Sequence, residues 1–114
     1  MATIKAFIDL SQSKKLAKIL PLESADMCYF NGDIGKISIG GWKNNTHDED
    51  DVPCWSLTAL LSVLPKIINN KTLFIATSAA LWHISYKNIY TAIDDNLIDA
   101  CVEMIIKLHE QKLL

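Results

Sequence analysis

The sequence predicts an α+β domain in which three helices alternate with two β-hairpins, in the order α-ββ-α-ββ-α. Asn31-Gly32 lies between two β-prone runs, which is typical of a two-residue hairpin turn, and a second pair of alternating runs spans residues 72–86. Leucines at helical spacing separate the two hairpins. Because hairpin strands are antiparallel neighbours, we expect one antiparallel sheet of about four strands, with the helices packed mainly on one face.

The chain begins with a predicted short strand over residues 3–10, where two sets of side chains alternate. Ser11 can cap a helix that runs to Leu20, since its hydroxyl can accept a hydrogen bond from an amide of the first turn. Pro21 then ends the helix, because proline has no amide hydrogen to donate. The solvated side of this helix carries Lys14, Lys15 and Lys18.

The first hairpin is predicted within residues 25–41, and a polar loop follows over residues 42–51. This loop carries the acidic run His47-Asp48-Glu49-Asp50-Asp51. The run could hold a divalent cation through its carboxylate oxygens, but it lacks the spaced acidic pattern and the glycine of a calcium loop. A solvated loop, whose charges favour the start of the next helix, is the stronger interpretation.

The uncharged stretch Val52–Pro65 is predicted to form the central helix, capped by Ser56 and ended by Pro65. One face repeats leucine at i, i+3, i+4 and i+7: Leu57, Leu60, Leu61 and Leu64. The opposite side is apolar as well, so that the polar side chains form a narrow strip: Thr58 and Ser62. We expect such a helix to be buried on more than one side, or to be covered by a partner.

The second hairpin is predicted to pair residues 72–77 with residues 81–86 around a turn at residues 78–80. Residues 87–94 are either a connection or an extension of the last strand. The pattern leaves these two alternatives open.

A final helix is predicted over residues 97–112, with a cap at Asp95-Asn96. Its apolar side is wider than a core-facing stripe needs to be. Glu103 and Lys107 are placed to form a favourable i, i+4 pair on its solvent-exposed edge.

Length and composition indicate one folded domain over residues 1–114. A chain of 114 residues buries roughly two thirds of its unfolded surface, and a hydrophobic content of 50% excludes intrinsic disorder. The apolar runs are shorter than a bilayer-spanning segment, so we expect no membrane association. The first residues lack the pattern of a secretory signal, so we expect the protein to be cytoplasmic.

The charge of the chain argues against nucleic acid as a partner. The formal net charge is −2 at pH 7, and the sequence has no arginine. Non-specific nucleic-acid affinity comes mainly from cationic side chains on phosphates, and arginine is the side chain best suited to bidentate phosphate recognition. We therefore expect no measurable binding to duplex DNA at physiological salt.

We expect the chain not to be an enzyme and to have no catalytic, cofactor-binding or metal-binding residues. The cysteines form no CxxC pair, which favours small buried side chains: Cys28, Cys54 and Cys101. The histidines fall in no metal-binding spacing: His47, His83 and His109. The glycines match neither a P-loop nor a dinucleotide-binding pattern, and no local signature of a serine or cysteine nucleophile is present.

Two patterns carry a resemblance to a known group of proteins. They are P-x-W-S-L-x-x-L-L-x-x-L-P at Pro53–Pro65 and D-N-x-x-D-A-x-x-E-M-I-I-x-L at Asp95–Leu108. Together they resemble small uncharacterised proteins encoded by phages and mobile elements of gut anaerobic bacteria, and they cover mainly the C-terminal half. That group has no established activity, so the resemblance implies a genetic context and no chemistry.

From these features we expect a non-enzymatic protein-interaction or regulatory accessory protein of phage or mobile-element origin. The two helices with excess apolar surface predict a symmetric homodimer, and a host or phage protein is a further possible partner. The expected interface residues lie on those helices or beside them: Trp55, Ala59, Val63, Val102 and Ile106.

Two other functions stay open at this point. The first is a small-ligand or nucleotide-binding inhibitor of host defence, with aromatic residues as a stacking platform: Trp42, Trp55, Trp82, Tyr29 and Tyr86. The second is a nucleic-acid binder that uses Lys14, Lys15 and Lys18.

Overall fold

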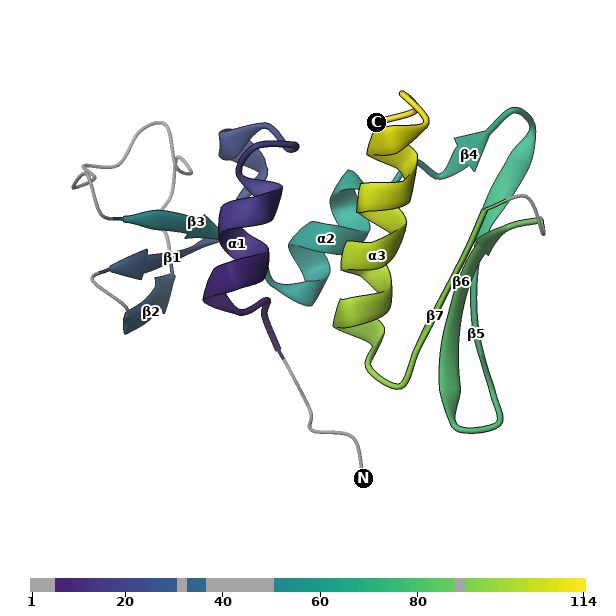
Figure 1. The fold of residues 1–114 in the computed structure, drawn as a ribbon, viewed down its shortest axis with the longest axis horizontal. Helices are drawn as coiled ribbons and strands as arrows, with labels where there is room; N and C mark the ends of the chain where they lie inside the picture. The colour runs from purple at the N-terminus through teal and green to yellow at the C-terminus, as the bar shows by residue number, and fades with distance from the viewer. Residues whose placement is uncertain (1–5, 31–32, 37–50, 88–89) are drawn as a thin grey trace. The chain divides into compact units, whose positions relative to one another are not determined.

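A computed structural model describes residues 6–30, 33–36, 51–87 and 90–114 of the chain (Figure 1). It divides into two compact units, Ala6–Val63 and Leu64–Leu114. Helices and antiparallel strands occur in both, which confirms the predicted α+β class. The prediction of one sheet needs a correction, because the two hairpins belong to different sheets, one in each unit. Within the described ranges, every helix is too short or too polar to cross a bilayer.

The first helix, α1 (Leu10–Leu16), begins earlier than the sequence predicted. Asp9 is its N-cap: the Asp9 carboxylate accepts from the Gln12 amide at 2.7 Å, and the Gln12 side chain accepts from the Asp9 amide at 3.0 Å. This reciprocal capping box satisfies two backbone amides, which a cap at Ser11 would not do. After Leu16 the chain continues in turns rather than in α-helix, and the short 3₁₀-helix η1 follows at Leu22–Ser24.

In the described part of the predicted strand over residues 3–10, the strand is reduced to one bridge. Phe7 pairs with Ser56 in an isolated antiparallel bridge, in which the Ile8 amide donates to the Trp55 carbonyl at 3.2 Å. Residues 1–5 lie outside the described ranges, and α1 already begins at Leu10.

The first hairpin is confirmed by the pairing of β1 (Met27–Phe30) with β2 (Asp33–Lys36). Phe30 lies opposite Asp33, as a two-residue connection requires, while the turn residues themselves and the predicted polar loop up to residue 50 lie outside the described ranges. A third strand, β3 (Val52–Cys54), pairs antiparallel with the other side of β1. The prediction of a helix over all of Val52–Pro65 was therefore wrong for its first residues, which satisfy their backbone groups in a sheet.

The central helix α2 (Leu57–Val63) starts at the predicted cap. The Ser56 hydroxyl accepts from the Ala59 amide at 3.3 Å, and the Leu60 amide donates to the Ser56 carbonyl. Ala59 and Leu60 are buried, whereas Leu57, Leu61 and Val63 are half-buried. The polar strip of Thr58 and Ser62 is exposed, as the helical spacing predicted.

The second unit contains a sheet with the described strand order β4-β5-β6-β7, all antiparallel. The strands are β4 (Ile67–Ile68), β5 (Lys71–Ser78), β6 (Leu81–Tyr86) and β7 (Tyr90–Asp94). Strands β5 and β6 form the predicted second hairpin. Strand β7 resolves the open alternative for residues 87–94, because it pairs with β6 as a strand of its own.

Two tight turns connect the strands at the start and the end of β5. Asn69-Asn70 joins β4 to β5 and has φ values of 49° and 66°, and Ala79-Ala80 joins β5 to β6 with φ values of 53° and 63°. Positive φ at both central residues is typical of type I′ hairpin turns, in which asparagine is favoured and alanine is strained.

The last helix, α3 (Leu97–Glu110), covers one face of this sheet by packing on β7 and β6 (Figure 1). Its predicted cap is confirmed, because the Asn96 side chain accepts from the amides of Ile98 at 3.0 Å and Asp99 at 3.4 Å. The core between α3 and the sheet includes Ile84, Tyr86, Ala92, Met104 and Ile105. The Tyr86 hydroxyl donates to the Pro65 carbonyl at 2.7 Å, so the polar tip of this buried ring has a partner.

Candidate functional site

The sheet of the Leu64–Leu114 unit has an inner face under α3 and an outer face that the described residues leave uncovered. Successive side chains of a strand point to opposite faces, so the row of half-buried Ile75 and buried Ile84 and Ala92 defines the inner face. The neighbouring row of Ala76, His83 and Ile93 therefore belongs to the outer face.

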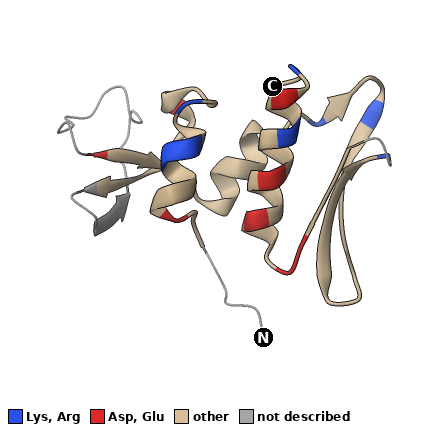
Figure 2. Ribbon diagram, in the orientation of Figure 1, with Lys and Arg blue, Asp and Glu red and all other residues tan. Residues whose placement is uncertain are grey.

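Four large apolar side chains stand on the outer face. Ile67 and Phe74 are each 62% exposed, Ile93 is 45% exposed and Leu81 is 36% exposed. The side chains between them include no lysine and no acidic residue: Thr72, Ala76, Ser78, His83, Ser85 and Thr91. Figure 2 shows that the charges of this sheet gather at the strand ends. An exposed group of large apolar side chains of this kind commonly marks an interaction site.

The outer face is hollowed next to Phe74. A shallow pocket of about 410 Å³ is lined by Asn70, Thr72, Phe74, Ser85 and Lys87. The Phe74 ring forms an apolar wall, and the other lining side chains offer hydrogen-bonding groups and one cation. This arrangement can accept an apolar side chain beside a polar one.

The outer face ends at the edge of β5, where Phe74–Ser78 is paired with no described strand on the side away from β6; we call this stretch the open edge. The Leu73 amide donates to the Lys66 carbonyl at 2.8 Å on the side of β4, away from β6. Because the amide and carbonyl of one residue point to the same side and alternate along an antiparallel strand, those of Ile75 and Thr77 also point away from β6. Strand β4 pairs with β5 at Lys71 and Thr72, and among the described strands none pairs with Phe74–Ser78 on that side.

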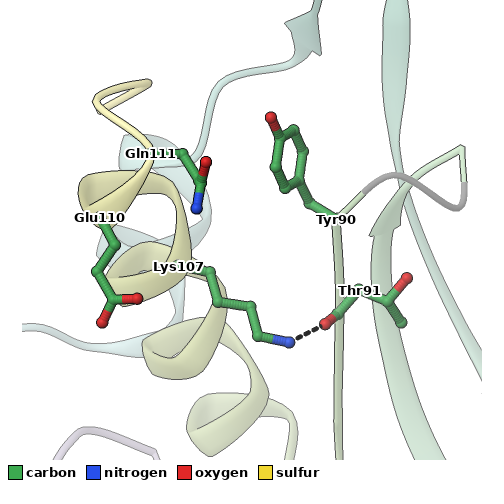
Figure 3. Close-up of a pocket in the computed structure, with 5 residues that line it drawn as sticks. All are labelled: Tyr90, Thr91, Lys107, Glu110 and Gln111. Carbon is green, nitrogen blue, oxygen red and sulfur yellow. Dashed lines mark hydrogen bonds between the residues drawn. The ribbon is translucent and has the colours of Figure 1, made fainter.

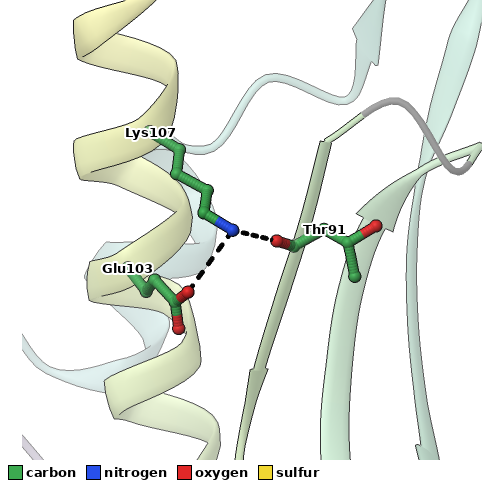
Figure 4. Close-up of polar contacts among 3 residues, drawn as sticks. All are labelled: Thr91, Glu103 and Lys107. Carbon is green, nitrogen blue, oxygen red and sulfur yellow. Dashed lines mark hydrogen bonds and ion pairs between the residues drawn. The ribbon is translucent and has the colours of Figure 1, made fainter.

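The opposite edge of the sheet, on β7, is occupied by a side chain of α3. The Lys107 ammonium donates to the Thr91 carbonyl and forms an ion pair with Glu103 at 3.4 Å (Figure 4). This contact confirms the predicted pair of Glu103 and Lys107. Lysine is a common device by which proteins protect an edge strand against pairing with another chain.

A second pocket lies beside this lysine. It has a volume of about 450 Å³ and is lined by Tyr90, Thr91, Lys107, Glu110 and Gln111 (Figure 3). The ammonium of Lys107 already has a carbonyl and a carboxylate as partners, so it does not provide an unpaired cation to this pocket.

The Trp-Ser-Leu residues of the sequence pattern are held by structural contacts in the Ala6–Val63 unit. The Trp55 indole nitrogen donates to the Ser24 hydroxyl at 2.9 Å, and the Ser56 amide donates to one Asp26 carboxylate oxygen at 2.9 Å. The Ser56 hydroxyl donates to the other oxygen of Asp26. These bonds fix the end of β3 and the start of α2, so a structural role accounts for the tryptophan and the serine of the pattern.

The three cysteines are free and buried, as predicted. Burial raises the pKa of the Cys101 thiol to about 12 and that of Cys28 to about 11, where the charge of Asp51 adds to the effect. Burial also raises the pKa of Cys54, whose sulfur lies 3.5 Å from the Ile8 carbonyl oxygen. A thiol that stays protonated at neutral pH is a poor nucleophile and a poor metal ligand.

The residues expected to form an interface differ in exposure. Trp55 is 0% exposed and therefore lies in the core. Ala59 and Val102 are also buried, whereas Val63 and Ile106 are half-buried. Sequence analysis did not select the four exposed residues of the outer face. The available signal was that both alternating sets of β5, Leu73 with Ile75 and Phe74 with Ala76, are apolar.

The other candidate residues are scattered. Of the proposed aromatic platform, Trp55 and Tyr86 are buried, the Tyr29 hydroxyl donates to the Ile8 carbonyl at 2.8 Å, and Trp42 lies outside the described ranges. The three lysines of the nucleic-acid alternative are exposed on α1 or just after it: Lys14, Lys15 and Lys18.

The structure describes little of the acidic loop. Residues 47–50 lie outside the described ranges, so the alternative of a cation site there stays open. Within the described ranges no cluster of histidine, cysteine or acidic residues is arranged to hold a metal ion.

Comparison of the chain with protein-family models, with curated proteins and with solved structures finds no match. The resemblance to phage and mobile-element proteins therefore stays a prediction, and the functional argument depends on the surface described above.

Proposed function

We propose that this chain is a non-enzymatic protein-interaction domain, a regulatory or accessory product of a phage or mobile element, that binds through the outer face of its four-stranded sheet. The observation that carries the proposal is the combination of four exposed apolar side chains with an open strand edge on one surface. The genetic context rests on the two sequence patterns alone.

The chemistry of this surface favours a protein over other ligands. The described outer face carries one lysine, Lys87 in the lining of the pocket beside Phe74, and no arginine, so it offers little basis for attracting phosphates. Apolar side chains on a pleated surface are suited to packing against side chains of another protein. The peptide groups at the edge can add hydrogen bonds that set the direction of a bound strand. The protonated, buried thiols give no support to nucleophilic catalysis.

Affinity purification from the natural host, with mass spectrometry of retained proteins and small molecules, tests this proposal. The matched variants are Phe74→Glu on the outer face and Leu22→Glu on η1, a control that is 40% exposed in the other unit. Each places a charge at an exposed apolar position, so both are expected to fold. A protein partner should be retained by the wild type and by Leu22→Glu and lost from Phe74→Glu.

Retention of the same protein by Phe74→Glu would overturn the assignment of the surface. Specific retention of a small molecule, with no protein, would overturn the interaction function in favour of a ligand-binding one. Retention of nucleic acid that is lost on charge reversal of Lys14, Lys15 and Lys18 would favour the third alternative.

A further inference from the structure

We infer that a second copy of this chain pairs with the open edge of β5, so that two β5 strands lie antiparallel across a two-fold axis and join the two sheets. This inference rests on the proposed function, because it names one partner of the same sheet.

The peptide groups at the edge determine how the strands can pair. Ile75 and Thr77 direct their amides and carbonyls away from β6, and an antiparallel partner bonds to such groups in alternate residues. In a symmetric pair centred on Ala76, Ile75 of one copy lies opposite Thr77 of the other. Ile75 of the first copy and Thr77 of the second then exchange two hydrogen bonds. The two-fold symmetry gives the same two bonds between Thr77 of the first copy and Ile75 of the second.

The length of the open edge favours a copy of the same hairpin over a longer strand. At one end β4 lies beside Lys71 and Thr72, on the same side as the open edge, and at the other end β5 turns at Ala79-Ala80. A long strand from another protein would collide with β4. The β5 of a second copy ends at Ser78, which lies opposite Phe74 when the pair is centred on Ala76, and the chain then turns back to its own β6 before it reaches β4.

The side chains along this edge allow close approach of two copies. Phe74–Ser78 contains no charge, so like charges do not repel across the axis. Ala76 would face Ala76 of the second copy in the closely spaced type of antiparallel pair, where small side chains fit. The β-branched side chains of Ile75 and Thr77 would lie opposite each other, a pairing that stabilises sheets.

Sedimentation equilibrium of the purified full chain, over about 1 μM to 1 mM, tests the inference. The wild type should form a dimer. Thr77→Pro removes an amide that points away from β6, so the β5–β6 ladder stays intact, while two of the bonds between copies are lost. It should weaken the dimer by roughly tenfold to a hundredfold. Thr77→Val keeps the amide and should dimerise like the wild type.

A charge-swap experiment tests the register and does not depend on how Thr77→Pro folds. Ala76→Lys places two like charges directly opposite each other and should be monomeric, as should Ala76→Glu. A mixture of the two variants should recover a one-to-one dimer. Ile93→Lys, in the same row of side chains but on β7, should leave the dimer unchanged.

A wild type that stays monomeric throughout this range would overturn the inference, as would a dimer that withstands both Thr77→Pro and Ala76→Lys. These results leave the proposed function standing if another protein is still captured in a Phe74-dependent manner. Loss of that capture, with a dimer that follows the charge swap, would instead overturn binding of a different protein and keep the self-pairing.

Discussion

The two units of the chain differ in how completely they cover their apolar side chains. In Ala6–Val63 the aromatic Trp55 and the thiols Cys28 and Cys54 are fully buried. In Leu64–Leu114 the inner face of the sheet is buried at Ile84, Tyr86 and Ala92, but the outer face exposes four large apolar residues. The difference arises because one helix, α3, covers one face of a sheet that has two.

Polar contacts differ between the units in the same sense. Trp55 and Ser56 form hydrogen bonds with Ser24 and Asp26, which are far away in the sequence. The segment before β1 therefore holds the junction between β3 and α2. In the other unit, the side chains of the outer face are exposed or half-buried. The peptide groups at the open edge of β5 are paired with no described strand. Among the described residues, the first unit thus binds its β3–α2 junction through segments distant in the sequence, and the second unit presents an apolar surface.

The largest expected effects come from truncating one buried side chain in each unit. Leu60→Ala in α2 and Ile84→Ala in β6 should each lower the free energy of unfolding by roughly 2–5 kcal/mol, because both residues are 0% exposed and their removal leaves a cavity. Phe74→Ala on the outer face should change it by less than about 0.5 kcal/mol. Urea unfolding of the three variants measures this, and a cost for Phe74→Ala like that of Ile84→Ala would show that the outer face is covered.

A smaller effect is expected at Tyr86, which links the inner face to Pro65. Tyr86→Phe removes its hydrogen bond and should cost about 1 kcal/mol at neutral pH. Burial, with a smaller contribution from Cys101, raises the pKa of Tyr86 to about 12, above its ordinary value of about 10. The folded state therefore holds the phenolic proton more tightly than the unfolded state does.

The stabilisation that comes from this shift is fully present below about pH 10 and is lost as the pH rises towards 12. Urea midpoints measured from pH 8 to pH 11 should fall more steeply for the wild type than for Tyr86→Phe. Parallel curves would show that the Tyr86 phenol is not buried as the inner face requires.

The two turns of β5 provide a smaller, stabilising test. Ala79→Asn with Ala80→Gly replaces strained residues at positive φ by the types that suit a type I′ turn, and should raise the free energy of unfolding by roughly 1 kcal/mol. Asn69→Ala with Asn70→Ala introduces the same strain at the other turn and should lower it by a similar amount. Thermal unfolding of both variants measures the change, and equal stability of all three proteins would contradict the assigned turn geometry.

We expect no difference between the urea concentrations at which the two units unfold. A single domain over residues 1–114 predicts coincident urea transitions for thiols in the two units. Variants that keep only Cys54 or only Cys101, with alanine at the other cysteine positions, report each unit separately through thiol labelling. Labelling of Cys101 at clearly lower urea than Cys54 would contradict the single domain and turn the comparison into one of two independent domains.

Local signals in the sequence determined much of the secondary structure. Asn31-Gly32 predicted the first hairpin, Ser56 and Asn96 predicted the caps of α2 and α3, and the alternation in residues 72–86 predicted the second hairpin. Each signal acts within a few residues, through a side chain that bonds a nearby amide or through a turn that needs a particular φ. Such signals can therefore be recognised without knowledge of the rest of the chain.

Tertiary structure alone decided which strands share a sheet and which apolar residues stay exposed. Strand β3 is short and contains Pro53, so no local pattern separates it from the entry to α2 until β1 supplies its hydrogen bonds. Phe74 and Ile75 are equally apolar in sequence, and they differ in exposure because α3 packs on one face of the sheet. Burial is a property of what lies opposite a side chain, and hydrophobicity along the sequence does not contain that information.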